Sequence, residues 1–205
     1  MPLPAWATDP YSLFITEEEY DALPADVCKS IEVVDGAVII CASPSPRHQR
    51  ILRNLSRALQ DARPSDGPCI DVLPDTDMFY VEQNAQDSDK GQWFTMRRPD
   101  ISVLYCLEGT GRLTSANVFT TVEITGPDSR QRDFQDKKAE YAGQRIPLYL
   151  IVVLDAQDTI KCMEEYRLDW SGRSYQLATV HHGVLHTELP EAMKLNVSFS
   201  ELESV

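Results

Sequence analysis

The sequence predicts an α/β domain whose core has the order helix, strand, strand, strand, helix, strand. Apolar residues recur at the helical period in one long segment, whereas several shorter runs are mostly β-branched or otherwise apolar, as buried strands are. The final three elements of this order are a strand, a helix and a strand, and the chain does not reverse between the two strands. This predicts a right-handed crossover and locally parallel pairing. We therefore expect a mixed sheet flanked by helices, with a hairpin before it and an antiparallel meander after it.

Composition is ordinary for one globular domain. The chain has 205 residues, of which 42% are hydrophobic and 25% charged. The simplest division is an N-terminal arm over residues 1–30 and a single domain over residues 31–200. A formal net charge of −13 works against broad, charge-driven nucleic-acid binding, but leaves room for a local basic cleft or an acidic metal site.

The five cysteines are scattered and contain no CxxC pair, which is typical of reduced thiols in a reducing compartment and excludes a zinc site of the usual spacing. The first residues lack the basic and apolar regions of a signal peptide. No run approaches the roughly 18 apolar residues that a membrane span needs. We expect a cytoplasmic protein without membrane contact.

The N-terminal part contains a short helix and a hairpin. Thr16 and Glu19 form the pattern of a capping box, and the helix should end before Pro24. Asp35-Gly36 between two β-branched runs predicts a hairpin over 31–42. Glu32 is the charged residue of its first strand; it is either a surface residue on an edge strand or an extra carboxylate near the cleft.

An amphipathic helix over 47–62 follows, capped by Ser45 or Ser43. His48 lies at its start, on the same side as the apolar residues, so it is either structural or directed into a cleft. The next strand covers 69–81, with a kink at Pro74.

The strand over 100–106 begins at Asp100, at a strand end where a side chain can face a cleft. Arg97 and Arg98 directly precede the Pro-Asp pair. They either contact phosphate, as weak candidates for nucleic-acid binding, or balance the acidic surroundings.

Glu123 lies inside the next strand, over 118–125, which is otherwise almost entirely apolar or β-branched. A buried carboxylate is costly unless it is paired or bound to metal, so the alternatives are an arginine partner and a metal site. The helix over 130–143 places Asp133, Lys137 and Tyr141 on one stripe. This stripe is either a surface ion pair or the face directed at Glu123.

A buried strand over 148–154 follows, and strands over 159–166, 174–180 and 183–187 form the expected meander, with His181 and His182 at a turn. Two carboxylates and a lysine from one corner of a sheet and a helix, Asp100, Glu123 and Lys137, form an arrangement that can hold a divalent cation and activate water.

Five segments together resemble the Uma-type family, which is grouped with restriction endonucleases in the PD-(D/E)XK nuclease superfamily. They are IEVVDGAVI, SPSPRHQRIL, RRPDISVL, VEITGPDSRQRDFQDKKAEY and IPLYLIVVLD, and the resemblance spans roughly residues 15–200. It implies a restriction-endonuclease-like core.

The resemblance also implies roles for individual residues. Asp100, Glu123 and the backbone carbonyl of Ile124 would bind the metal. Thr125 stands where the superfamily pattern has lysine, and Lys137 takes the role of the catalytic lysine through a D-x-x-x-K-x-x-x-Y pattern. Glu32, His48, Asp133 and Tyr141 are the accessory candidates.

The implied activity is hydrolysis of DNA phosphodiester bonds by an endonuclease that depends on Mg²⁺ or Mn²⁺. By analogy to other nucleases of this fold, we also expect a homodimer. Two alternatives stay open: a catalytically inactive nuclease fold used for binding or assembly, and a metal-dependent hydrolase of another substrate.

Overall fold

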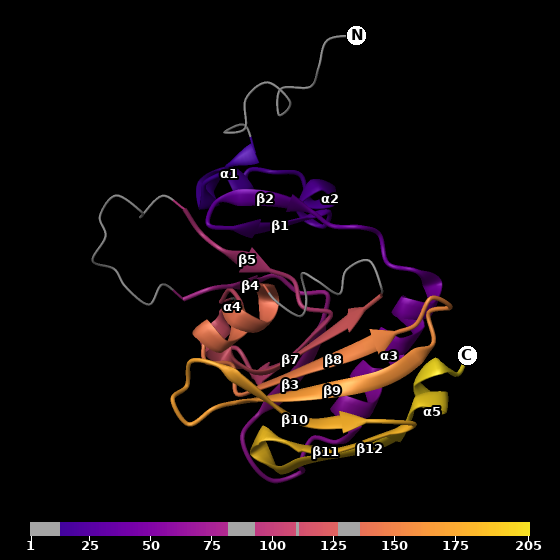
Figure 1. Cartoon of the computed structure of the whole chain (residues 1–205). Coiled ribbons are helices and arrows are strands. Elements are labelled where there is room, and N and C mark those ends of the chain that lie inside the picture. The colour runs from indigo at the N-terminus through magenta and orange to yellow at the C-terminus, as the bar shows by residue number, and fades with distance from the viewer. Residues whose placement is uncertain (1–12, 82–92, 110, 127–135) are drawn as a thin grey trace.

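The computed structural model describes residues 13–81, 93–109, 111–126 and 136–205. Two sheets lie one above the other in Figure 1, with the smaller sheet near the N-terminus. The small sheet has the order β2-β1-β5-β4 and the large sheet the order β10-β9-β8-β7-β6-β3. The small-sheet strands are β1 (Ile31–Val34), β2 (Ala37–Ile40), β4 (Met78–Phe79) and β5 (Met96–Arg97). The large-sheet strands are β3 (Ile70–Pro74), β6 (Ile101–Tyr105), β7 (Val118–Thr125), β8 (Leu148–Leu154), β9 (Ile160–Leu168) and β10 (Tyr175–His181).

The remaining elements surround these sheets. They are α1 (Glu17–Asp21), α2 (Ala25–Cys28), α3 (Pro46–Asp61), α4 (Lys138–Gly143), α5 (Phe199–Glu203), a separate hairpin of β11 (Val184–Leu189) and β12 (Met193–Ser198), and 3₁₀ turns at Ser115–Asn117 and Pro190–Ala192. None of the helices in the described ranges is long and apolar enough to cross a membrane.

The large sheet is mixed, as predicted. β7 and β8 pair in parallel, whereas the other neighbours in this sheet pair antiparallel. β7 is buried along its whole length. α3 and α5 pack on one face of the sheet and α4 on the other, so the sheet separates two apolar clusters. The crossover between β7 and β8 carries α4 and thereby brings it next to β7.

α3 confirms the predicted amphipathic helix. The Ser45 side chain accepts a hydrogen bond from the backbone N–H of His48 at 3.1 Å, and Pro46 occupies the first turn, where a missing N–H costs nothing. Leu55 and Leu59 are completely buried against the sheet. This packing fixes the helix on the sheet, and the start of the helix, with His48, lies at one end of the sheet beside Asp100.

The hairpin is also confirmed. Asp35 and Gly36 adopt φ values of 47° and 80°, as a type I′ turn requires. Gly36 is needed for a second reason, because a Cβ atom there would lie 2.3 Å from the Trp93 ring.

The single kinked strand predicted over 69–81 is wrong. Asp75 turns the chain with a φ of 46°, and its N–H donates to the Asp100 carbonyl at 3.1 Å. The segment therefore leaves the large sheet after β3 and joins the small sheet as β4. The predicted meander is correct for β9 and β10, which pair antiparallel, but β11 leaves the sheet to pair with β12. His181 ends β10 and lies buried beside Glu165, not in a turn.

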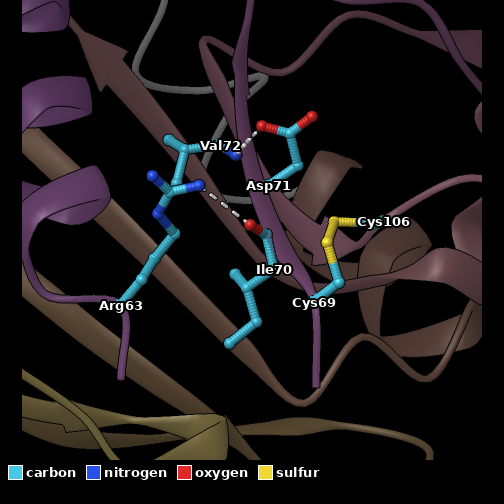
Figure 2. The surroundings of a disulfide bond; sticks show 6 residues. All are labelled: Arg63, Cys69, Ile70, Asp71, Val72 and Cys106. Carbon is cyan, nitrogen blue, oxygen red and sulfur yellow. Dashed lines mark hydrogen bonds between the residues drawn. A yellow bond between two sulfur atoms is a disulfide. The ribbon is translucent and has the colours of Figure 1, made fainter. Parts of the chain in front are cut away.

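A disulfide joins Cys69 and Cys106 at one end of the β3–β6 pair (Figure 2). The two residues lie just beyond the register pair Ile70–Tyr105, and their Cα atoms are 5.3 Å apart. The prediction that all five cysteines are reduced thiols is therefore wrong for this pair. Strand pairing brings together residues separated by 37 positions, which cysteine spacing does not reveal.

Candidate active site

A cleft of about 370 Å³ lies where the small sheet, the start of α3 and one end of the large sheet meet. It is lined by most of the site residues that the sequence indicated: Glu32, His48, Arg98, Asp100, Glu123, Ile124 and Lys137. These residues come from both sheets and from two helical segments, so the cleft exists only in the folded chain.

Glu123 lies in the middle of the site and is only 4% exposed. The Lys137 ammonium donates to both of its carboxylate oxygens at 2.9 Å, and the Tyr141 hydroxyl donates to Oε1 at 2.7 Å. Burial and the negative charge of Glu123 raise the pKa of Tyr141 well above its usual value, so this hydroxyl keeps its proton and acts as a donor. Among the residues that the structure describes, the charged partner of this carboxylate is thus a lysine.

Lys137 lies immediately before α4, and its side chain is 4% exposed. Its Nζ atom also lies 3.3 Å from Oε1 of Glu32. Lys137 and Tyr141, four residues apart, both contact Glu123, which confirms that this helical face is directed at the β7 carboxylate. Asp133, the first residue of the predicted stripe, lies outside the described residues.

Glu32 is buried within the small sheet, at 2% exposure, and is not a surface residue. It accepts hydrogen bonds from the Arg97 guanidinium at 2.9 Å and from the backbone N–H of Arg98 at 3.1 Å. Burial alone would raise the pKa of Glu32, but the positive charges of Lys137 and Arg97 outweigh it and lower the pKa. Glu32 is therefore an ionised partner of two cations.

Arg97 is 1% exposed, and its guanidinium binds Glu140 through two nitrogens in addition to Glu32. A group held in this way is not accessible to a phosphate, so Arg97 belongs to the buried ionic network and not to a nucleic-acid surface. Arg98 is half-buried and lines the cleft. Its guanidinium donates to Asp77 and to the carbonyls of Cys28 and Lys29.

Asp100 precedes β6 and is held from two sides. One carboxylate oxygen lies 3.0 Å from Nε2 of His48, and the other accepts the backbone N–H of Ile124. Burial alone would lower the pKa of His48, but the hydrogen bond to Asp100 and its negative charge raise it. His48 is thus directed into the cleft, and Asp100 lies beside the residue that follows Glu123.

Two members of the site were not anticipated. Asp75 lines the cleft, and burial together with the nearby charge of Asp100 raises its pKa. Glu140 binds Arg97 and accepts a hydrogen bond from Tyr80 at 3.0 Å. Helical spacing could have indicated Glu140, which lies three residues after Lys137, whereas no sequence pattern marks Asp75.

The donor set fits a hard divalent cation by its chemistry, because carboxylate and carbonyl oxygens are the ligands that Mg²⁺ prefers. Asp100, Glu123 and the backbone of Ile124 line the same cleft. Within the described ranges, no three His, Cys, Asp or Glu side chains are grouped closely enough to hold a metal ion. The oxygens of Glu123 face Lys137 and Tyr141, and those of Asp100 face His48 and Ile124.

Comparison with known proteins identifies the family and the fold. The model of the Uma2 family, described as "Putative restriction endonuclease", matches residues 17–200. A crystal structure of "a putative nuclease belonging to DUF820" from Anabaena variabilis superimposes with a TM-score of 0.64 at 18% sequence identity, covering 92% of this chain and 97% of the other. A comparison with curated proteins gave no match. The chain shares the fold of this DUF820 protein, and it belongs to the Uma2 family.

Proposed function

We propose that this chain is an endonuclease that uses Mg²⁺ or Mn²⁺ to hydrolyse phosphodiester bonds in DNA. One observation carries the proposal: Asp100, Glu123 and Lys137 come from three different elements and line a single cleft. Two carboxylates and a lysine that line one cleft are the groups that metal-assisted phosphodiester hydrolysis needs.

Asp100, Glu123 and the backbone carbonyl of Ile124 would hold the cation. When bound, the cation neutralises charge on the phosphate and lowers the pKa of a coordinated water molecule. Its binding requires the Glu123 carboxylate to share its oxygens between the metal and the groups that now contact it. Tyr141, which donates to Oε1 of Glu123, keeps the carboxylate directed into the cleft.

Lys137 orients the attacking water and offsets the negative charge that develops on the phosphate. A flexible lysine can do so only if its ammonium is held in place. Glu32 and Glu123 hold this ammonium at 3.3 Å and 2.9 Å. In the same way, His48 and the N–H of Ile124 fix the carboxylate of Asp100.

By analogy to the fold, we further propose that two copies cooperate to cut both strands. Sedimentation of the purified protein would measure this assembly.

A cytoplasmic location stays a prediction, and the disulfide removes the support that the cysteine pattern gave it.

The test combines metal binding with cleavage. Calorimetry with Mg²⁺ and Mn²⁺ and nicking of a supercoiled plasmid are measured for the native chain, Asp100→Asn, Glu123→Gln and Lys137→Ala. Asp66→Asn is the control, because this exposed carboxylate lies beyond the far end of α3. Circular dichroism verifies folding. We expect loss of metal binding in both carboxylate variants, retention in Lys137→Ala, and a loss of cleavage of about 100-fold or more in all three.

Cleavage that is equal in the native chain and the three site variants would exclude this cleft as the active site. If the native chain binds neither ion at millimolar concentration and does not cut DNA, the alternative of a binding or assembly module is correct. Metal binding with hydrolysis of another phosphodiester, but not of DNA, would assign a different substrate.

A further inference from the structure

α3 carries positive charge on a strongly acidic chain. The whole sequence has a net charge of −13, yet this helix contains a single carboxylate, Asp61, at its last position. Its arginines form what we term the arginine stripe: Arg47, Arg50, Arg53 and Arg57.

The stripe lies away from the sheet. Arg50, Arg53 and Arg57 fall within a sector of about 60° on the helix, given 100° of rotation per residue. This sector is opposite to Leu55 and Leu59, which are buried against the sheet. Arg47 and Arg57 are about 15 Å apart along the helix axis, at 1.5 Å per residue. Arg50, Arg53 and Arg57 therefore form a rigid row along the helix, and Arg47 lies about 60° around the helix axis from Arg50.

Most of these cations are not neutralised by the protein. Within the described part of the chain, no ion pair involves Arg50, Arg53 or Arg57. By contrast, Arg97, Arg98 and Arg112 all pair with carboxylates, as expected in a chain with 32 acidic residues. Arg50, Arg53 and Arg57 thus remain available to an anionic partner.

The stripe begins at the rim of the cleft. His48, in the first turn of α3, lines the cleft, and Arg47 donates to the Gln157 carbonyl at 2.8 Å, in the turn between β8 and β9. Arg47 and Arg50 line a second cavity of about 120 Å³, and Asp158 lines both cavities. A polymer bound in the cleft can therefore continue along α3.

We propose that the arginine stripe binds consecutive phosphates of duplex DNA that flanks the bond in the cleft. The proposal rests on the proposed function. What it adds is the position of the duplex on the protein. The length of the stripe matches the axial rise of roughly four base pairs at 3.4 Å per step. Guanidinium groups suit this role because they bind phosphate oxygens through paired donors.

The salt dependence of binding tests this proposal. Each phosphate contact adds about 0.9 to the slope of log K against log salt concentration. Anisotropy of a labelled 20-base-pair duplex is measured in EDTA, which prevents metal-dependent cleavage. The proteins are the native chain, Arg50→Gln/Arg57→Gln, and the control Arg145→Gln/Arg173→Gln, which removes two exposed charges elsewhere. The stripe variant should lower the slope by about 2 and weaken binding several tens of times at about 0.1 M salt; the control should change neither.

An equal change in both double variants would overturn the proposal, because it would show that only overall charge matters. An unchanged slope in the stripe variant, or binding of single-stranded RNA in preference to the duplex, would also overturn it. Plasmid cleavage by the native chain separates the two proposals: cleavage with an unchanged slope refutes the stripe alone, whereas a lowered slope without metal-dependent cleavage refutes the nuclease chemistry alone.

Discussion

The two sheets are held by different interactions. The large sheet separates two extensive apolar clusters, and a disulfide joins two of its strands. The small sheet has a much smaller cluster, whose fully buried members are Tyr20, Ile31, Val33 and Met96. It is fixed to α4 by buried ion pairs of Glu32 and Arg97 with Lys137 and Glu140. The small sheet therefore positions Lys137, and a disturbance of its ion pairs should reach the cleft.

The largest loss of unfolding free energy is expected for Arg97→Gln. The change leaves two carboxylates, Glu32 and Glu140, without their shared cation, and breaking a buried pair in this way costs about 3–5 kcal/mol of unfolding free energy. Urea unfolding measures it. Arg112→Gln is the matched control, since Arg112 pairs with Glu17 and Asp21 at the exposed surface and should lose about 0–1 kcal/mol. Equal losses in the two variants would contradict the contrast between buried and exposed pairs.

Reduction of the disulfide should cause an intermediate loss of unfolding free energy. Breaking the bond between Cys69 and Cys106 raises the conformational entropy of the unfolded chain. The expected loss of unfolding free energy is about 2–4 kcal/mol. Unfolding with and without dithiothreitol measures the loss. Cys69→Ser/Cys106→Ser should not respond to the reductant, whereas Cys28→Ser, which changes a free thiol, should respond as the native chain does. A native chain that is indifferent to dithiothreitol would show that the bond contributes nothing to stability.

The smallest expected change in the free energy of unfolding is the one caused by acidification. Because the pKa of Glu32 is lower in the folded chain than its usual value of 4.5, its stabilising contribution is complete above about pH 4.5 and is lost as the pH falls through the folded-state pKa. The loss for one proton is at most about 1.4 kcal/mol per pH unit. Unfolding free energies of the native chain and Glu32→Gln should therefore converge below pH 4.5. A constant difference down to pH 3 would contradict an ionised Glu32.

Sequence patterns predicted the parts of the fold that depend on local signals. The caps at Thr16 and Ser45, the Asp35-Gly36 turn and the parallel crossover all follow from nearby residues. The end of β3 at Asp75 and the pairing of β11 with β12 depend on which strands meet, and a single sequence does not contain that information.

The same distinction applies to the site. Glu123 was recognisable because a carboxylate in an apolar strand requires a partner, and helical spacing placed Lys137 and Tyr141 on one face. The burial of Arg97 was not recognisable, since its partners Glu32 and Glu140 lie 65 and 43 residues away. The sequence left two alternatives for Arg97, contact with phosphate or balance of the acidic surroundings, and its ion pairs agree with the second.

The positions of the aromatic residues give the two sheets separate optical signals. Trp93 packs against Gly36 and Phe14 beside the small sheet, whereas Trp170 is 96% exposed at the turn after β9. The large sheet instead contains a tyrosine group in which Tyr149 contacts Tyr141, Tyr166 and Tyr175. Trp6 lies outside the described residues. In a Trp6→Phe variant, a shift in tryptophan emission should therefore report the release of the small sheet. Near-ultraviolet circular dichroism of the tyrosines should report the loss of the large sheet in the same unfolding experiment.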